Sequence, residues 1–257
     1  MKLFICIFSF FISTSLHALY NGNPSFPTMP EQGIWSPDEQ WWGIKLGYQG
    51  DCVWSKHLKF HKGAGSDGEF FGTLRTMKNE GMLTYNIIDR LEFFGSVGSM
   101  EAKLTAQPAG RMKIKYKTDT DLVWGIGGRV ILFHSKKIVM GVNAKYATSC
   151  LSINQAILNG IEQKKGKGHF TYYEWQLGVG FSREIKRIIP YLGLAYSSMR
   201  GYFHHTLFIS KNEIAEAKEH FILFLGAGIT NGLILDLNLE VRMIGEKAVS
   251  LSIDFRL

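Results

Sequence analysis

The chain has 257 residues, a net charge of +7 and a mean hydropathy of −0.01. Apart from one short N-terminal run it lacks the continuous apolar stretches of roughly 20 residues that transmembrane helices need, which excludes a helical membrane protein. No long basic run with interleaved aromatic residues occurs, so nucleic acid is not an expected partner. The 13% of aromatic residues and the 28 glycines suit a β-barrel and a soluble β-sandwich equally.

Residues 1–18 have the pattern of a secretory signal peptide. Met1 and Lys2 precede the apolar run 3–11, and Ala18 offers a small residue at the expected cleavage position. An uncleaved anchor is the alternative, but the apolar run is too short to span a bilayer as a helix. Cleavage would leave 239 residues (257 − 18) and, with Lys2 removed, a net charge of +6.

Residues 19–40 form a proline-rich segment without periodicity. It contains four of the six prolines, Pro24, Pro27, Pro30 and Pro37. Because proline lacks a backbone donor and fixes its own backbone angle, the segment is predicted to be an extended or loosely ordered lead-in, in the periplasm or in a lumen.

From residue 41 onwards, apolar side chains recur at every second position. The clearest segments are 42–54, 83–97, 112–116, 122–132, 138–146, 173–181, 192–196, 221–241 and 247–257. A barrel strand must present an apolar stripe to lipid and a polar stripe to the lumen. Residues 41–257 are therefore predicted to form an all-β, transmembrane antiparallel β-barrel of about 14 strands, within a range of 12–16. Segments 152–168 and 210–220 resist strand assignment and are expected to be surface loops, the second with a short helix.

Charged residues at the polar positions are candidates for lining a pore. They are Lys45, Arg75, Arg111, Lys113, Lys115, Arg129, Lys145, Glu174, Asp236, Glu240, Arg242 and Asp254. Their excess of positive charge predicts a mild anion preference, since charged rings set the selectivity of a pore. The segment 111–117 has a second interpretation, in which it is a strand beyond the bilayer edge and its lysines only keep that edge soluble.

The remaining candidate sites carry little chemistry. In an oxidising compartment Cys52 and Cys150 could form a disulfide, cross-link to neighbours or stay free, and the sequence does not choose among these. His204 and His205 are adjacent on an expected strand and face opposite sides, so no metal site is predicted, and no cofactor is expected. No local motif assembles a nucleophile, a base and an orienting group, so we expect no enzymatic activity.

Several segments resemble the chlamydial major outer membrane protein family of porins. They are 19–24, 47–51, 85–94, 173–176, 189–193 and 239–257, and they are distributed from end to end of the chain. The resemblance implies a porin barrel in the bacterial outer membrane. The chain is shorter than typical members and has fewer cysteines, which implies trimmed surface loops and no extensive disulfide-linked coat. Leu257 replaces the aromatic residue that is common at the end of such barrels, with Phe255 two positions earlier.

The first functional hypothesis is a porin for passive diffusion of small hydrophilic solutes, with a structural role in the envelope. The alternative is a non-conducting structural or adhesive barrel, whose lumen is occluded by side chains or by the lead-in segment. An outer-membrane enzyme and a soluble periplasmic sandwich also stay open. The expected partners are outer-membrane lipid, the barrel-assembly machinery, small solutes and ions, and two further copies of the chain in a homo-trimer.

Overall fold

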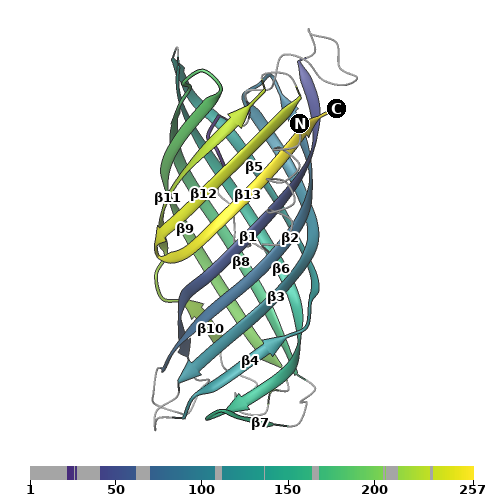
Figure 1. Cartoon of the computed structure of the whole chain (residues 1–257), viewed down its shortest axis with the longest axis vertical. Helices are drawn as coiled ribbons and strands as arrows, with labels where there is room; N and C mark the ends of the chain where they lie inside the picture. The colour runs from purple at the N-terminus through teal and green to yellow at the C-terminus, as the bar shows by residue number, and fades with distance from the viewer. Residues whose placement is uncertain are drawn as a thin grey trace, which may run out of the picture.

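The computed structural model describes residues 22–25, 27, 41–61, 70–107, 112–135, 137–163, 168–204, 206, 214–231 and 234–257. The predicted signal peptide and Arg111 lie outside these residues. Thirteen antiparallel strands form one closed sheet (Figure 1). They are β1 Trp42–His61, β2 Phe70–Ile87, β3 Leu91–Gln107, β4 Ile114–Thr118, β5 Asp121–Ser135, β6 Ile138–Leu158, β7 Ile161–Gln163, β8 Gly168–Arg183, β9 Ile188–His204, β10 Ile214–Ala217, β11 Phe221–Thr230, β12 Leu235–Ile244 and β13 Glu246–Arg256. No described residue belongs to a helix that is long and apolar enough to cross a membrane.

The closed sheet has more strands at one end than at the other. At the end near the C-terminus the ring runs β1, β13, β12, β11, β9, β8, β6, β5, β3, β2 and back to β1, which is ten strands. At the opposite end it runs β1, β10, β9, β8, β6, β4, β3, β2 and back to β1, which is eight. The difference arises because the β12–β13 hairpin turns at Gly245, part-way along the barrel, where β10 takes over the pairing with β1 and β9 (Figure 1). The barrel therefore narrows toward the end that carries β10.

The thirteen strands are one fewer than predicted and lie within the predicted range of 12–16. Two pairs of them, β4 with β5 and β10 with β11, are successive parts of interrupted strands against β3 and β9. Several of the other strands are long, with 20 residues in β1, 18 in β2 and 21 in β6. Since a membrane strand needs about 9 to 11 residues, these strands continue well past the bilayer, and fewer of them fit into the chain.

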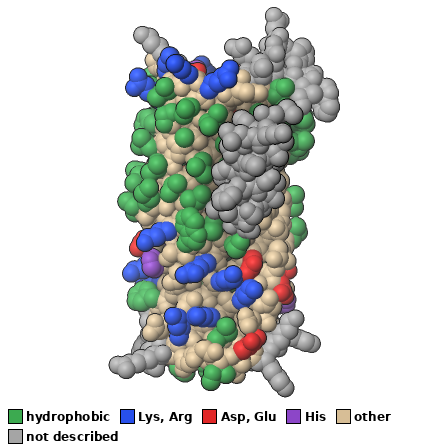
Figure 2. Space-filling view, viewed as in Figure 1, with side chains coloured by type: hydrophobic (Ala, Val, Ile, Leu, Met, Phe, Trp, Pro, Cys, Tyr) green, Lys and Arg blue, Asp and Glu red, His purple; other side chains and the backbone are tan. Residues whose placement is uncertain are grey.

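The outer surface divides into two halves. Hydrophobic side chains cover the half toward the termini, whereas lysine and arginine side chains gather over the half that carries β4 and β10 (Figure 2). Leu46, Phe93, Ile126 and Leu194 are among the exposed apolar residues of the first half. The terminal half matches a lipid-facing band, and the other half matches a surface that faces water. The connections at the terminal end are short turns, such as 88–90, and those at the other end are longer, so the polar half faces the cell exterior.

A β-bulge in β1 changes which residues face the interior. The register between β1 and β13 shifts between Val53 and Ser55. Before the bulge Lys45 and Asp51 are buried inside, and after it Lys56 and Phe60 are. Because a bulge adds one unpaired residue, it reverses the alternation of the strand beyond it.

Both expected surface loops contain strand residues. Segment 152–168 includes the end of β6 and all of β7, and segment 210–220 includes β10, with no helix among its described residues. The prediction of a short helix there was wrong. Glu216 and Ala217 favour helix only weakly as isolated residues, and pairing of β10 with both β1 and β9 overrides that preference.

Candidate functional site: the barrel lumen

The membrane half of the lumen is filled with charged side chains rather than lined by them. Fourteen charged residues that face inward are buried, and we call them the ionic layer. They are Lys45, Asp51, Lys56, Lys78, Glu80, Glu92, Arg129, Lys145, Glu174, Glu240, Arg242, Glu246, Asp254 and Arg256. In a water-filled channel such groups would be exposed to solvent, so their burial indicates that the lumen is occupied.

One ion pair crosses the barrel interior between strands that are not neighbours. Lys56 Nζ on β1 contacts Glu174 Oε1 on β8, and both side chains are at most 4% exposed. At this level β8 is three steps from β1 through β10 and β9, and five steps through β2, β3, the β4–β5 strand and β6. Glu246 Oε2 lies 3.1 Å from Lys56 Nζ, and Ser197 Oγ donates to Glu174 Oε1 at 2.7 Å. Protein atoms therefore bridge the lumen at this level.

Two further ion pairs connect strands that are not neighbours, and a third, between Arg129 and Glu92, connects the adjacent strands β5 and β3. Lys145 Nζ on β6 lies 3.4 Å from Glu80 Oε2 on β2. Glu92 on β3 accepts from Lys45 at 2.8 Å and from Arg129 at 3.2 Å. Since breaking a buried pair leaves an uncompensated charge in a medium of low polarity, these contacts hold the opposing walls together.

Arg242 is the centre of a second cluster in the ionic layer. Its guanidinium lies 3.1 Å from Asp51, 3.6 Å from Glu240 and 3.0 Å from Glu246. All four side chains are at most 1% exposed. Three carboxylates around one guanidinium connect β1, β12 and β13 on the inside of the wall.

The narrow half of the lumen is closed by an apolar core, which we call the apolar plug. Its members come from every strand of the eight-strand ring and are Leu58, Phe60, Phe70, Leu74, Met100, Ala102, Leu104, Ala106, Ile114, Tyr116, Val123, Leu151, Ile153, Ala156, Phe170, Tyr172, Met199, Phe203, Ala215 and Ala217. Phe203 is central, with ring centroids of Phe170, Tyr116 and Phe60 at 4.9, 6.0 and 6.1 Å. An eight-strand barrel is just wide enough for its own side chains to fill it, so the plug follows from the narrowing.

Part of the proline-rich segment crosses the lumen at the wide end. Asn23 Nδ2 donates to Asn238 Oδ1 on β12 at 3.2 Å, and the Ser25 and Ser182 hydroxyls are hydrogen-bonded on the β8 side. The Pro27 carbonyl accepts from Asn86 Nδ2 on β2 at 2.6 Å. The backbone N–H of Gly22 donates to Glu240 Oε2 at 3.2 Å. Residues 22–25 and 27 thus connect three walls of the barrel in a third obstruction.

Eight of the twelve predicted pore-lining residues face the lumen. They are Lys45, Arg129, Lys145, Glu174, Asp236, Glu240, Arg242 and Asp254. The assignment was wrong for Arg75, Lys113 and Lys115, which are exposed on the outside. The physical reason is that Leu74, Ile114 and Tyr116 enter the apolar plug. The residues that alternate with them must therefore point outward, and these include Arg75, Lys113 and Lys115.

The positive excess behind the predicted anion preference is not found among the described inward residues. Lys45, Arg129, Lys145 and Arg242 are matched by four inward carboxylates of the same set, those of Glu174, Asp236, Glu240 and Asp254. Sequence reasoning also missed Lys56, Lys78, Glu80 and Glu92. The spacing of Thr76, Lys78 and Glu80 at alternate positions was the signal that could have identified the inner face of β2.

The two cysteines of the described chain are free. Cys52 is buried on β1 and Cys150 is exposed on β6. The disulfide between them, one of the alternatives open from the sequence, is not formed. Among the described residues no group of His, Cys, Asp and Glu could hold a metal ion.

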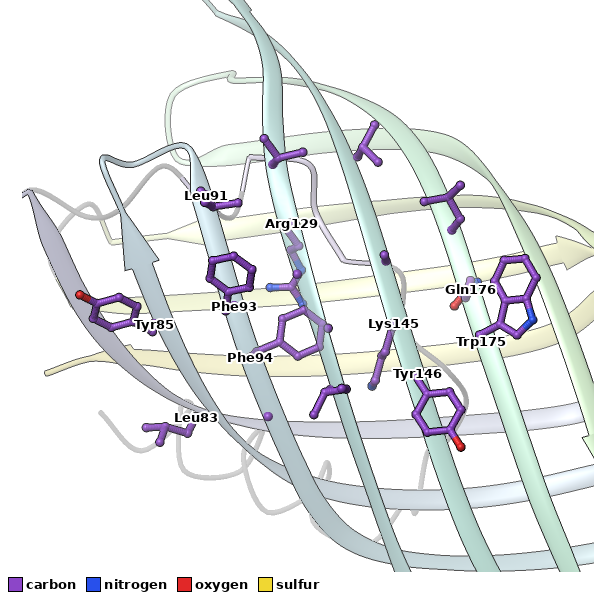
Figure 3. Close-up of a pocket in the computed structure, with 18 residues that line it drawn as sticks. Leu83, Tyr85, Leu91, Phe93, Phe94, Arg129, Lys145, Tyr146, Trp175 and Gln176 are labelled. Carbon is purple, nitrogen blue, oxygen red and sulfur yellow. The ribbon is translucent and has the colours of Figure 1, made fainter.

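A shallow groove on the outer wall, of about 990 Å³, lies in the hydrophobic band (Figure 3). It is lined by Phe93, Tyr146 and Trp175. Its lining also includes Gly95 and Gly128, which have no side chains to fill it. Its apolar side chains project away from the lumen, so it suits the hydrocarbon of the bilayer.

Comparisons with known proteins agree with this architecture. No family model matches the chain. A major outer membrane porin of Chlamydia pneumoniae is 23% identical over 271 aligned positions, which cover 71% of this chain and 70% of that protein. The serovar F major outer membrane porin of Chlamydia trachomatis is 23% identical over 278 positions, with 72% and 70% covered.

Solved outer-membrane barrels are similar at low identity. The translocator domain of autotransporter NalP from Neisseria meningitidis has a TM-score of 0.45 and 10% identity, with 84% of this chain and 88% of that chain covered. The outer membrane protease OmpT of Escherichia coli has a TM-score of 0.39 and 9% identity, with 84% and 93% covered. The chain is a β-barrel of the bacterial outer membrane and a distant relative of the major outer membrane porins of Chlamydia.

Proposed function

We propose that this barrel is closed to solutes and acts as a structural component of the outer membrane. The observation that carries the proposal is the direct contact of Lys56 with Glu174 across the ring, followed along the axis by the apolar plug. A solute that entered at the wide end would meet residues 22–25 and 27, then the ionic layer and then the plug. Each obstruction is built from different residues.

The apolar plug is the strongest barrier of the three. Moving an ion from water into an apolar medium costs of order 20 kcal/mol in the idealised case, and Phe60, Phe170 and Phe203 offer it no compensating partner. Opening the plug would expose these buried aromatic side chains to water, at roughly 1.5–3 kcal/mol for each. Because of these two costs, conduction of ions would require a large rearrangement of the barrel.

Diffusion of small hydrophilic solutes is the second candidate, favoured by the name of the relatives, which are porins. It requires the plug and the ionic layer to move apart. The near balance of inward charges gives no reason for an anion preference in such an opened state. Insertion by the barrel-assembly machinery and assembly into a homo-trimer stay predictions. The relatives are not named as enzymes, and we propose no reaction for this chain.

Liposome swelling tests the proposal. Residues 19–257 are refolded in detergent, checked for heat-modifiable migration, and reconstituted into liposomes that are then diluted into an isosmotic solution of a small sugar. We expect liposomes that contain the protein to swell no faster than protein-free liposomes at every protein-to-lipid ratio. An open general porin serves as the positive control. A swelling rate that rises with the amount of folded protein would contradict the closed lumen and favour the diffusion porin.

A further inference from the structure

Three cations face each other directly on the outer surface of the water-exposed half. Arg75 on β2 is opposite Lys103 on β3, and Lys103 is opposite Lys117 on β4. Lys115 lies two residues from Lys117 on the same face. All four residues, which we call the basic row, are exposed. Like charges at directly opposite positions of neighbouring strands destabilise a sheet, so this arrangement opposes folding unless something outside the chain offsets it.

The chain itself neutralises little of this charge. Lys103 Nζ lies 3.3 Å from Glu101 Oε1, whereas Arg75, Lys115 and Lys117 form no ion pair with any described residue. Four cations and one carboxylate leave a net charge of +3 (4 − 1) on adjoining positions of three strands. In the lumen, by contrast, Lys56, Lys145 and Arg242 each have carboxylate partners within 4 Å. The imbalance is thus confined to the outer surface.

The basic row belongs to the water-exposed half of the barrel. Lys115 and Lys117 lie on β4, which is in the half over which Figure 2 shows lysine and arginine side chains beyond the hydrophobic band (Figures 1 and 2). Lys117 is opposite Lys103 on β3, and Leu122, an exposed apolar residue of β5, is opposite Ser99, four residues away on β3. With about 3.3 Å per residue and a strand tilt of about 40°, four residues place Lys117 roughly 10 Å outside that apolar position. The polar layer of a phospholipid bilayer is only about 5–8 Å thick on each side, so the row lies beyond it.

We propose that the basic row binds the phosphates and acidic sugars of lipopolysaccharide, the glycolipid of the outer leaflet, whose anionic sugar layer extends past the phospholipid headgroups. Arg75 can hold a phosphate through two parallel hydrogen bonds, and the lysines act as point charges beside it. Directly opposite residues have Cα atoms about 4.5–5.5 Å apart, so the row spans about 10 Å and can contact more than one anionic group. Such a contact would fix the barrel in the leaflet, and it does not depend on whether the lumen conducts.

The test compares two triple variants with the same change in charge. The first is Arg75→Gln, Lys103→Gln and Lys117→Gln. The control is Lys137→Gln, Arg183→Gln and Arg187→Gln, which removes three exposed cations at the opposite end of the barrel. Labelled, refolded residues 19–257 in a zwitterionic detergent are titrated with lipopolysaccharide, with its dephosphorylated form, with phosphatidylglycerol and with heparin. Heat-modifiable migration verifies the fold, and loss of repulsion should leave the row variant at least as stable as the parent.

We expect lipopolysaccharide to bind the row variant at least about tenfold more weakly than the parent, with the control unchanged. Added salt should weaken binding to the parent and to the control, and should change binding to the row variant much less. Dephosphorylated glycolipid and phosphatidylglycerol should bind more weakly than intact lipopolysaccharide. Equal binding of the parent and the row variant would overturn the proposal. Row-dependent binding of heparin that is as tight as that of lipopolysaccharide would also overturn it, because the partner would then be a soluble polyanion.

Discussion

Lys56 on β1 and Glu174 on β8 meet inside the barrel, although at their level β1 and β8 are at least three steps apart in the sheet. They are 118 residues apart in the sequence. Glu174 also accepts hydrogen bonds from Ser197 and from the Tyr172 hydroxyl, so its position is fixed from the β8 and β9 walls. The pair therefore joins the two sides of the barrel and closes the lumen at the same level.

Replacing Lys56 with Met should strongly destabilise the barrel. The change leaves Glu174 and Glu246 buried without their shared cation, and loss of one partner of a buried pair typically costs about 3–5 kcal/mol. The additional change Glu174→Gln should restore part of the loss, since it removes one of the two charges. The free energy of unfolding in urea, measured in detergent, checks both. The control is Lys247→Met, which makes the same substitution at a neighbouring exposed lysine. If it lowered the free energy of unfolding as much as Lys56→Met does, the loss would not come from breaking a buried ion pair.

Phe203→Ala should open a cavity in the apolar plug. Phe203 is 1% exposed and contacts three other aromatic rings, so the expected loss is about 3–5 kcal/mol. Leu192→Ala is the matched control, because Leu192 is 59% exposed in the hydrophobic band and its surroundings are as apolar as the protein interior. We expect less than about 1 kcal/mol there. Similar unfolding energies for the two variants would mean that the outer half has no packed interior.

Gly245→Ala should disturb the hairpin that sets the strand number. Gly245 has φ +79°, and a Cβ atom there would overlap the Phe221 carbonyl oxygen. A residue forced into this region costs of order 1–3 kcal/mol. Gly95→Ala is the control, since nothing lies within 4 Å of a Cβ at that position. Thermal unfolding followed by circular dichroism should show a lower midpoint for Gly245→Ala alone, and equal midpoints would disprove the tight turn.

The two cysteines should differ in reactivity. Cys150 is exposed on β6 in the half that faces water, whereas Cys52 is buried. A membrane-impermeant maleimide added to folded protein in liposomes should therefore label the parent and Cys52→Ser, but not Cys150→Ser. In denaturant Cys150→Ser should become reactive at Cys52. Labelling of Cys52 in the folded protein would contradict its burial, and failure to label Cys150 would contradict its exposure to water.

The fold class followed from alternation because lipid and lumen impose opposite demands on neighbouring residues. The assignment of faces in 249–257 and 173–181 matches the structure. Alternation alone does not say which face is inside, and this explains the error at Lys113 and Lys115. In the outer half the interior is apolar and the exterior is polar. The apolar residues of an alternating strand therefore face inward there, and its charged residues face outward.

The contents of the lumen could be predicted only in part. Eight inward charges were identified from their strand positions, but their partners lie on distant strands, and no local pattern predicts which carboxylate meets Lys56 or Lys145. The bulge between Val53 and Ser55 has no sequence signal of its own, yet it decides that Lys56 points inward. The length of the strands, which lowered the strand count, depends on pairing beyond the membrane.

Single-channel recording in a planar bilayer tests the closed lumen most directly. Refolded residues 19–257 are added to the bilayer in a salt solution, and insertion is verified by recovering folded protein from the membrane. We predict no stepwise increase of conductance over the range of applied voltages. Reproducible unitary steps from the inserted, folded protein would contradict the account, because ions could not then be excluded by the Lys56–Glu174 contact and the apolar plug.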